Sequence, residues 1–289
     1  MRAAVVAHRH SRTNLALAAG AWNGTPAALL PPRRALLVLA PGDVALARLD
    51  VRDDLEGVED GLTALDRLHE NGVRVLNRPP ALLCAHDKLL TARCLRRAGL
   101  PHPRSVFVQH LAGPPDVDFP AVVKPRFGSR GRDVLLCRDR HELERRLEAL
   151  RSRSWFRNSG ALVQELIPPR GHDLRVVIAG GTVVGAARRT AAAGEWRTNV
   201  ALGASVAPVS PPPVAVELAV AAASAAGLDL VGVDLLPTGP GGFCVLELNG
   251  AVDFTPRYSL SGQRVYADAM QALAGNPERA VRETLAAQA

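Results

Sequence analysis

The sequence predicts a mixed fold of the α/β and α+β class, in which an open α/β domain precedes two α+β units. Three observations predict it. In residues 1–85, short apolar runs alternate with helical patterns, which is typical of an open parallel sheet. In residues 86–167, two strands flank a glycine-rich loop. After residue 171 the strands are typical of antiparallel hairpins. We therefore expect domains over residues 1–85, 86–167 and 168–289.

The N-terminal domain is expected to contain three strands and two helices. Leu62, Leu65 and Leu68 recur near helical spacing and mark the better of the two helices. The loop after the first strand lacks a GxGxxG motif, so no dinucleotide site is predicted there, and His8 and His10 are expected on the surface. The strands are expected at residues 2–8, 35–40 and 73–79, and the helices at residues 13–22 and 58–70.

The central domain is expected to begin with a helix that opens at Asp87 and closes at Gly99, where two prolines follow as stop signals. A second helix begins at Asp139, which is predicted to cap it in a capping box with Glu142. Apolar runs around these helices indicate four strands. They are expected at residues 104–109, 119–125, 133–138 and 159–167.

The C-terminal domain is expected to open with a hairpin over residues 173–190 that turns at Gly180 and Gly181. A helix over residues 210–227 follows, with Ser210 as its cap, prolines in its first turn and a glycine as its terminator. Two more strands are joined by the turn PTGPGG. They are expected at residues 230–236 and 242–249.

Charge and composition limit the possible function classes. The 289-residue chain carries a net charge of +7, which suits an anionic substrate or nucleotide as well as nucleic acid. Nucleic-acid binding is disfavoured because the arginines are spread along the chain, aromatic residues make up 4%, and no DNA- or RNA-binding motif occurs. Four scattered cysteines indicate neither a disulfide framework nor a zinc site. No signal peptide and no membrane segment are expected. A cytoplasmic location is expected instead.

Two lysines stand out because arginine is the usual cation of this chain. Of 35 basic residues, Lys88 and Lys124 alone are lysine. Lys124 lies between a strand and a loop with Gly128, Ser129 and Gly131, whose backbone N–H groups can approach phosphates. GxxxxGK[ST] is absent, so this is not a Walker A loop. A hairpin whose tip folds over a triphosphate is predicted, although a glycine loop by itself is more often a simple turn.

Three oxygen donors are expected to meet on the last two strands. Asp234 and Glu247 lie about equally far from the turn, so antiparallel pairing places them opposite one another. Asn249 is two residues beyond Glu247 and therefore on the same face. Facing carboxylates among apolar neighbours repel unless a cation or a proton neutralises them. Such oxygen ligands suit Mg²⁺ shared with phosphates. The alternative is a pair of solvated carboxylates.

The segment GEWRTN forms a third group. Glu195, Arg197 and Asn199 alternate, so they point to one side of an extended segment. With Arg188 and Arg189 before them, they can bind an anionic substrate or stabilise charge on a transferred phosphoryl group. In a basic chain, the alternative is a solvated arginine-rich loop.

Taken in this order, the motifs resemble the ATP-grasp superfamily and, within it, the RimK-like amino-acid ligases. The resemblance covers about residues 76–255. It rests on HDKLLTARCLRRAGLPHP, VVKPRFGSRGRDV, VQELI, HDLRVVIAGGTVVGAARR, GEWRTN and the pair GVDLL and VLELN. It implies the ATP-grasp fold, in which an N-terminal pre-ATP-grasp domain precedes two α+β subdomains that clasp ATP. The glycine-rich loop would belong to the first subdomain and the metal site to the second.

The resemblance also implies roles for individual residues. Lys124 and Arg197 would act in catalysis, and Ser129 and Gly131 of the glycine-rich loop would lie against the nucleotide. Lys88 and Lys124 would contact the ATP phosphates, Glu165 and Leu166 the adenine, and Asp173 the ribose. The phosphates and the reacting acyl group would be contacted by Arg197, Thr198 and Asn199. Mg²⁺ or Mn²⁺ would be bound by Asp234, Glu247 and Asn249.

The implied reaction is amide formation through an acyl phosphate, with release of ADP and phosphate. A glutamate-like amino acid would be joined to an acceptor carboxylate on a protein, a carrier protein, a cofactor or a small peptide. Relatives suggest a homo-oligomer, either a dimer or a tetramer. Many of them follow the metal-binding asparagine with small residues, proline and glycine, whereas this chain reads NGAVDFTPRYSL. The role of Gly250–Leu260 is therefore left open.

Two alternatives from other function classes remain. A nucleotide-binding regulator without ligase activity would share the fold, although the complete set of Asp, Glu and Asn argues against it. A basic nucleic-acid-binding protein is indicated by the charge alone.

Overall fold

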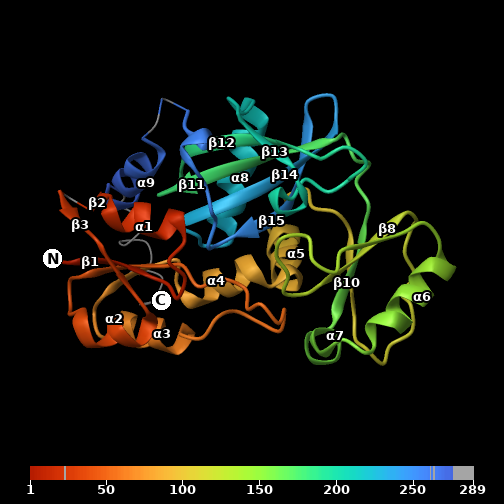
Figure 1. The fold of residues 1–289 in the computed structure, drawn as a ribbon, viewed down its shortest axis with the longest axis horizontal. Helices are drawn as coiled ribbons and strands as arrows, with labels where there is room; N and C mark the ends of the chain where they lie inside the picture. The colour runs from red at the N-terminus through yellow and green to blue at the C-terminus, as the bar shows by residue number, and fades with distance from the viewer. Residues whose placement is uncertain (23, 261, 263, 276–289) are drawn as a thin grey trace.

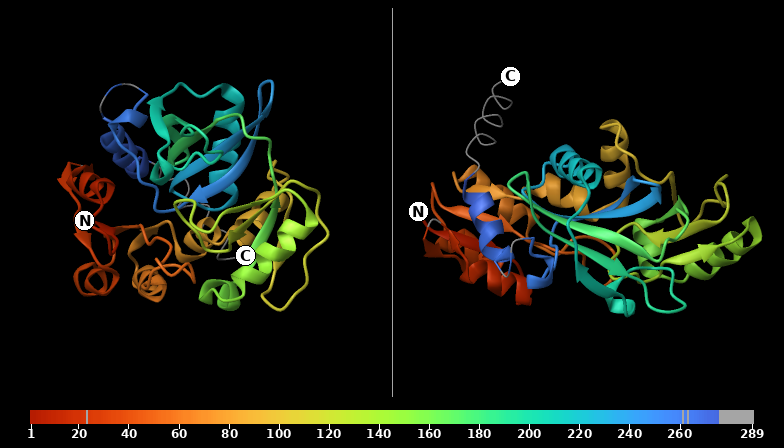
Figure 2. Two further views of the ribbon diagram at one scale, coloured as in Figure 1. Left: turned by 45° about the vertical axis from the view of Figure 1, so that its right-hand side comes forward. Right: turned by 90° about the horizontal axis from the view of Figure 1, so that it is seen from above.

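The computed structural model describes residues 1–22, 24–260, 262 and 264–275, arranged around three main sheets (Figure 1). The N-terminal and central sheets lie at opposite ends of the molecule, and the C-terminal sheet lies between them (Figure 2). This mixed α/β architecture agrees with the predicted fold class. Within the described residues, no helix has both the length and the apolar character needed to cross a bilayer.

The N-terminal sheet is parallel, as predicted. Its elements are β1 (Ala3–Val6), α1 (Arg12–Ala19), β2 (Ala21–Trp22), β3 (Thr25–Pro26), β4 (Ala28–Leu30), α2 (Pro32–Val38), β5 (Val44–Ala47), α3 (Leu62–Glu70) and β6 (Arg74–Leu76). The strand order is β4-β1-β5-β6, while β2 and β3 form a separate ribbon. Since β1 neighbours both β4 and β5, the chain places successive strands on either side of its first strand.

The strand predicted over residues 35–40 is wrong, because helix α2 takes most of these residues. Pro31 is the N-cap and Pro32 lies in the first turn, where its missing N–H is not needed and its fixed φ favours a helix. The run ALLVLA is too short and too uniformly apolar for its periodicity to separate a strand from a helix. The sheet positions belong instead to β4 and β5, which were not predicted.

The central sheet is antiparallel, in the order β7-β10-β8-β9. The elements of this part are α4 (Pro79–His86), α5 (Lys88–Arg97), β7 (Ser105–Val108), β8 (Ala121–Pro125), β9 (Leu135–Cys137), α6 (Arg140–Leu150), α7 (Ser154–Ser159) and β10 (Ala161–Glu165). The predicted hairpin around the glycine-rich loop is confirmed, since β8 pairs with β9. The predicted helix starts are also confirmed, because Asp87 accepts from the amide of Leu89 and Asp139 from the amide of Glu142.

The C-terminal sheet is antiparallel throughout and confirms the predicted hairpin turn at Gly180 and Gly181, both of which have positive φ. Its elements are β11 (His172–Ala179), β12 (Thr182–Thr190), η1 (Val200–Leu202), β13 (Ser205–Pro208), α8 (Pro213–Ala225), β14 (Leu230–Gly239), β15 (Gly242–Asn249), η2 (Pro256–Tyr258) and α9 (Val265–Ala274). The strand order is β13-β12-β11-β14-β15.

The predicted Ser210 cap is wrong. Helix α8 begins at Pro213, and its N-cap is Pro212, which offers no side-chain hydrogen bond. Three consecutive prolines follow Ser210. Because a residue before proline is driven to extended backbone, the helix starts only at the last of them.

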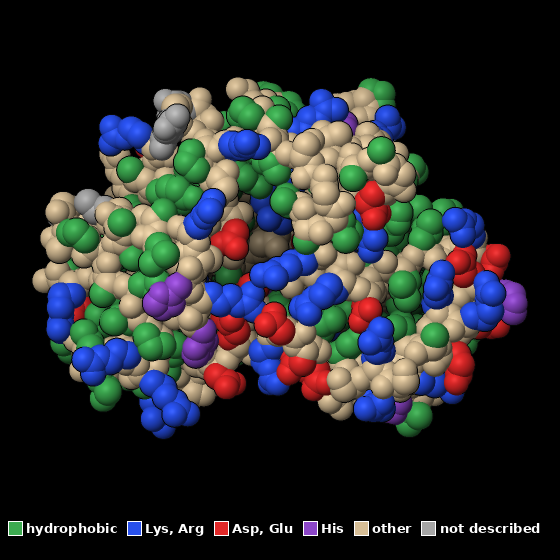
Figure 3. Space-filling view, in the orientation of Figure 1, with side chains coloured by type: hydrophobic (Ala, Val, Ile, Leu, Met, Phe, Trp, Pro, Cys, Tyr) green, Lys and Arg blue, Asp and Glu red, His purple; other side chains and the backbone are tan. Residues whose placement is uncertain are grey.

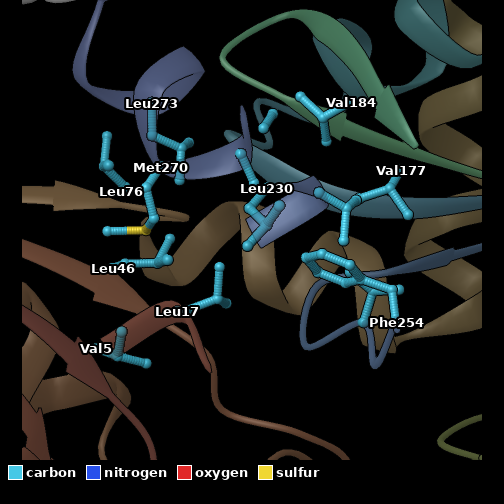
Figure 4. Packing of buried hydrophobic residues seen from close by; sticks show 14 of the residues in the cluster. Val5, Leu17, Leu46, Leu76, Val177, Val184, Leu230, Phe254, Met270 and Leu273 are labelled. Atoms are coloured by element: carbon cyan, nitrogen blue, oxygen red, sulfur yellow. The ribbon is translucent and has the colours of Figure 1, made fainter. Parts of the chain in front are cut away.

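A shared hydrophobic core joins the N-terminal sheet to the C-terminal sheet. Val5 and Leu46 lie in one cluster with Leu230 of β14 and Met270 of α9 (Figure 4). Burial of each large apolar side chain contributes about 1.5–3 kcal/mol. The central sheet has a core of its own, in which Trp155 is one of the buried side chains and into which Val51 and Leu55 of the N-terminal domain pack. The central and C-terminal sheets have different cores and meet across a seam.

Asn77, directly after β6, fastens the N-terminal domain to the C-terminal sheet. Its buried side-chain amide accepts from the amides of Asp229 (2.7 Å) and Leu230 (3.0 Å) and donates to the carbonyls of Leu230 (2.7 Å) and Gly250 (3.2 Å). We expect Asn77→Ala to lower the free energy of unfolding by about 3–5 kcal/mol, because several buried backbone groups lose their partner. Urea unfolding of this variant and of Asn71→Ala, at an exposed position, provides the comparison. Equal midpoints for both variants would contradict the role assigned to Asn77.

Candidate active site

One cleft, between the central and C-terminal sheets, collects most of the residues that the sequence indicated. The space within it, counted together with the part that is open to solvent, is about 1010 Å³. The face in Figure 3 is hollowed near its centre, and Lys and Arg side chains gather around the opening. Of the predicted site residues, Asn249 does not line the cleft. Those that do are Lys88, Lys124, Ser129, Gly131, Glu165, Leu166, Asp173, Arg197, Thr198, Asn199, Asp234 and Glu247.

The two lysines meet at Glu247. Its carboxylate lies 3.6 Å from Lys88 Nζ and 3.9 Å from Lys124 Nζ. Lys88 also donates to the carbonyl of Gly128 at 2.8 Å, and Lys124 donates to Gln164 Oε1 at 2.7 Å. Burial lowers the pKa of Lys124 to about 8; the nearby Lys88 acts in the same direction and Glu247 opposes it. Two closely spaced ammonium groups offer phosphate oxygens charge-assisted hydrogen bonds.

The glycine-rich loop packs against the segment that carries Arg197. Gly131 has a φ of 71°, and a Cβ at this position would lie 2.7 Å from Asn199 Oδ1, so glycine is needed here. Arg197 donates to the carbonyl of Gly131 at 3.1 Å and pairs with Glu195 at 2.7 Å. Hydrogen bonds from Arg197 lower the pKa of Glu195 to about 2. These contacts hold the guanidinium of Arg197 beside the loop.

A row of alternating charges crosses the C-terminal sheet at the cleft. Asp234 accepts from Arg175 at 2.7 Å through both oxygens and from Arg189 at 2.8 Å. Arg189 also donates to Asp173 at 2.8 Å, and Thr198 Oγ1 donates to Asp173 at 2.5 Å. Burial alone would raise the pKa of Asp234, but the two guanidinium groups lower it to about 2. Asp234 is therefore charged, whereas burial raises the pKa of Asp173 in spite of Arg189; both aspartates have partners on their two oxygens.

The predicted pairing of Asp234 with Glu247 is confirmed by the register of β14 and β15. Asn249 lies opposite Gly232 and donates to its carbonyl at 3.4 Å. Two carboxylates and an amide oxygen fit Mg²⁺ by donor chemistry, and the Glu247 side chain is 26% exposed towards the cleft. Among the described residues, no cluster of three or more His, Cys, Asp or Glu could hold a metal. The arginines on Asp234 would have to withdraw for this carboxylate to bind a cation.

Glu165 and Leu166 border the cleft where β10 ends. The amide of Leu166 donates to the carbonyl of Pro120 at 3.3 Å, and the amide of Glu165 donates to the carbonyl of Arg104 at 2.9 Å. The contact of these residues with adenine stays a prediction. So does the contact of Asp173 with the ribose, since its two oxygens already bind Arg189 and Thr198.

The sequence analysis missed the arginine partners of the Asp234 and Asp173 carboxylates. Arg175 had a signal: it lies two residues after Asp173 on the same strand face and opposite Asp234 in the sheet. Arg189 was considered as an anion-binding residue and not as the partner of Asp173. Gln164 had no comparable signal, because its contact with Lys124 depends on which strands become neighbours in the central sheet.

Known proteins match the part of the chain that holds the cleft. A family model described as a RimK-like ATP-grasp domain matches residues 85–268. Beta-citrylglutamate synthase B from Homo sapiens is 32% identical over 204 residues, which cover 68% of this chain and 52% of that protein. Tetrahydromethanopterin:alpha-L-glutamate ligase from Methanosarcina acetivorans is 34% identical over 221 residues, which cover 68% of this chain and 65% of that protein. The chain thus spans about half to two thirds of the length of these relatives.

Solved structures share the fold over nearly the whole chain. The RimK domain protein ATP-grasp from Sphaerobacter thermophilus has a TM-score of 0.65 and 24% identity, covering 96% of this chain and 99% of that one. D-alanine--D-alanine ligase from Bacillus anthracis, complexed with ATP, has a TM-score of 0.69 and 18% identity, covering 98% and 99%. At these identities the likeness concerns the fold alone.

Proposed function

Since the chain belongs to the RimK-like ATP-grasp family, we propose that it is an ATP-dependent ligase that joins a carboxylate to an amine through an acyl phosphate. One observation carries the proposal. The two lysines of the chain, from separate elements, lie within 4 Å of the same Glu247 carboxylate at the cleft. Burying two ammonium groups beside each other is costly, and a polyphosphate would offset that cost.

The first half of the reaction transfers a phosphoryl group. A substrate carboxylate oxygen attacks the γ-phosphorus of ATP, the bond to the β-phosphate oxygen breaks, and ADP leaves. Lys88 and Lys124 neutralise the phosphate oxygens, and Arg197 offsets the charge on the group in transfer. Glu247, with its neighbours Asp234 and Asn249, would hold Mg²⁺, which would supply further polarisation of the phosphates when bound.

The second half forms the amide. The amine attacks the acyl carbon, phosphate leaves with the C–O electron pair, and the nitrogen loses its proton to solvent. The glycine-rich loop and Arg197, which contact each other at Gly131, close the cleft against water that would hydrolyse the acyl phosphate. No covalent bond to a protein side chain is needed.

Glutamate is the proposed amine substrate. It occurs in the names of the relatives beta-citrylglutamate synthase B, tetrahydromethanopterin:alpha-L-glutamate ligase and N-acetylaspartylglutamate synthase A. The acceptor carboxylate belongs to a protein, a carrier protein, a cofactor or a small peptide. A homo-oligomer in the cytoplasm completes the proposal.

The proposed function predicts strict requirements for turnover. ADP and phosphate are expected only when ATP, Mg²⁺ or Mn²⁺, an amino acid and a carboxylate acceptor are all present, because both carbonyl activation and amine attack take place in the cleft. A screen of glutamate and other amino acids against candidate carboxylates, read by ADP release, measures this. EDTA is expected to abolish the signal. AMP and pyrophosphate in place of ADP would mean adenylation and contradict the acyl-phosphate route.

The two alternative functions predict other results. A regulator without activity would bind an ATP analogue yet release no ADP with any pair of substrates. A nucleic-acid-binding protein would retain a DNA or RNA duplex with strong salt dependence and no effect of ATP.

A further inference from the structure

A chain of hydrogen bonds behind the cleft ends on the Lys124 ammonium. Lys124 and Gln164 lie diagonally on the neighbouring strands β8 and β10, both 3% exposed, and Lys124 Nζ donates to Gln164 Oε1 at 2.7 Å. The Gln164 amide nitrogen lies 2.8 Å from Ser105 Oγ and 3.4 Å from His102 Nε2. A small pocket bordered by His102, Lys124 and Gln164 lies beside Glu247.

The tautomer of the His102 imidazole is fixed by the hydrogen bond of its second ring nitrogen, Nδ1. His102 Nδ1 lies 2.7 Å from the carbonyl oxygen of Val245, which can only accept, so the proton is on Nδ1. Burial, together with the nearby Lys124, lowers the pKa of His102 to about 4, so the ring is neutral near pH 7. Nε2 therefore carries a lone pair and accepts.

Two acceptors decide which way Gln164 points. Ser105 Oγ donates its proton to the carbonyl of Pro103 at 3.0 Å, so towards Gln164 it accepts, as His102 Nε2 does. Both hydrogens of the Gln164 amide are thereby used, and its oxygen must face Lys124. A flipped amide would present N–H groups to an ammonium, which has no lone pair to accept them.

His102 also connects this series of hydrogen bonds to β15, the strand that carries the predicted metal ligands Glu247 and Asn249. Its segment is clamped to Val245 twice, since the Val245 amide donates to the carbonyl of Pro101 at 2.9 Å and the Val245 carbonyl accepts from His102. Val245 lies two residues before Glu247 on β15. The imidazole thus links the strand of Glu247 to the ammonium of Lys124, across the seam between the central and C-terminal sheets.

We infer that His102 is a positioning residue: through Gln164 it holds Lys124 Nζ where a phosphate oxygen of the nucleotide can reach it. This inference rests on the proposed function, because it gives Lys124 a nucleotide to contact. His102 itself contacts neither the nucleotide nor the reacting atoms.

Paired substitutions test the lone pair of His102. The side chain introduced by His102→Met is nearly as long as the one introduced by His102→Gln. Methionine has only a weak thioether acceptor, whereas glutamine offers an amide oxygen. We expect His102→Met to lower kcat/KM for ATP by about tenfold or more, because a displaced Gln164 loses its hydrogen bond to the charged Lys124, and His102→Gln to stay within about threefold of the wild type. His69→Met, at an exposed position on α3, is the control and is expected to match the wild type.

The scarcity of lysine allows a direct readout. The chain has Lys88 and Lys124 as its only lysines, so ¹⁵N-lysine labelling gives two ammonium signals, which Lys88→Arg assigns. In His102→Met the Lys124 signal is expected to shift or broaden while the Lys88 signal and the backbone amide spectrum stay. If His102→Met does not fold, Gln164→Met is expected to produce the same loss of kcat/KM for ATP.

Two results would overturn the inference. Wild-type kinetics and an unchanged Lys124 signal in His102→Met would show that the ammonium needs no such support. Equal losses in His102→Met and His102→Gln would mean that only the shape of the ring matters. Failure of the proposed function is distinguishable: the wild type would release no ADP, while the Lys124 signal and the affinity for a non-hydrolysable ATP analogue would still report on His102.

Discussion

Lys124→Met is expected to lower ATP turnover by about a hundredfold to a thousandfold, the usual effect of removing one preorganised donor from a developing charge. Lys124 is 3% exposed, and its Nζ already has Gln164 and Glu247 as neighbours. ADP release at saturating substrates measures the loss.

The same substitution is expected to leave the protein at least as stable as the wild type. An ammonium whose pKa is lowered to about 8 by burial is costly to fold in, and methionine fills a similar volume without a charge. Arg93→Met, at an exposed position of α5, is the matched control for loss of a cation and is expected to keep full turnover. Wild-type turnover in folded Lys124→Met would refute the role of this lysine.

Asp234→Asn and Glu247→Gln are both expected to lose turnover, but they should differ sharply in stability. Asp234 is 3% exposed and binds both Arg175 and Arg189, so losing its charge leaves the Arg175 guanidinium without a paired carboxylate and leaves Arg189 with Asp173 alone. We expect Asp234→Asn to lower the free energy of unfolding by about 3–5 kcal/mol. The Glu247 side chain is 26% exposed, and its shorter ion-pair distance, to Lys88, is 3.6 Å. Glu247→Gln is therefore expected to change the free energy of unfolding by about 1 kcal/mol or less.

Urea unfolding of the two variants beside Asp66→Asn, an exposed carboxylate on α3, tests this difference. Equal midpoints for Asp234→Asn and Asp66→Asn would mean that the arginine pairs contribute nothing. Retained turnover in Glu247→Gln with Mg²⁺ present would remove this carboxylate from the proposed metal site.

The parts of the fold that the sequence predicted well are those set by local chemistry. Asp87 and Asp139 begin their helices as expected, because a carboxylate at the N-cap satisfies nearby amides whatever the rest of the chain does. The cross-strand pair of Asp234 and Glu247 was also predictable, since a short turn joins the two strands and the two register shifts between the turn and this pair cancel. Residues 35–40 were assigned wrongly because a short apolar run has no period to read.

The sequence by itself determined which groups are available: two lysines in an arginine-rich chain, a glycine-rich loop, and oxygen donors across one hairpin. Only the tertiary structure decided what those groups contact. It brings Lys88 and Lys124 to the same carboxylate, covers Asp234 with two arginines, and sets His102 behind Lys124 through Gln164. The physical reason is that these contacts join residues far apart in the chain, within one sheet for Asp234 and its arginines and between the central and C-terminal sheets for Lys124 and Glu247. The free energy gained by burying apolar surfaces that are far apart in the chain fixes how the sheets pack together. The spacing of residues within one motif does not predict it.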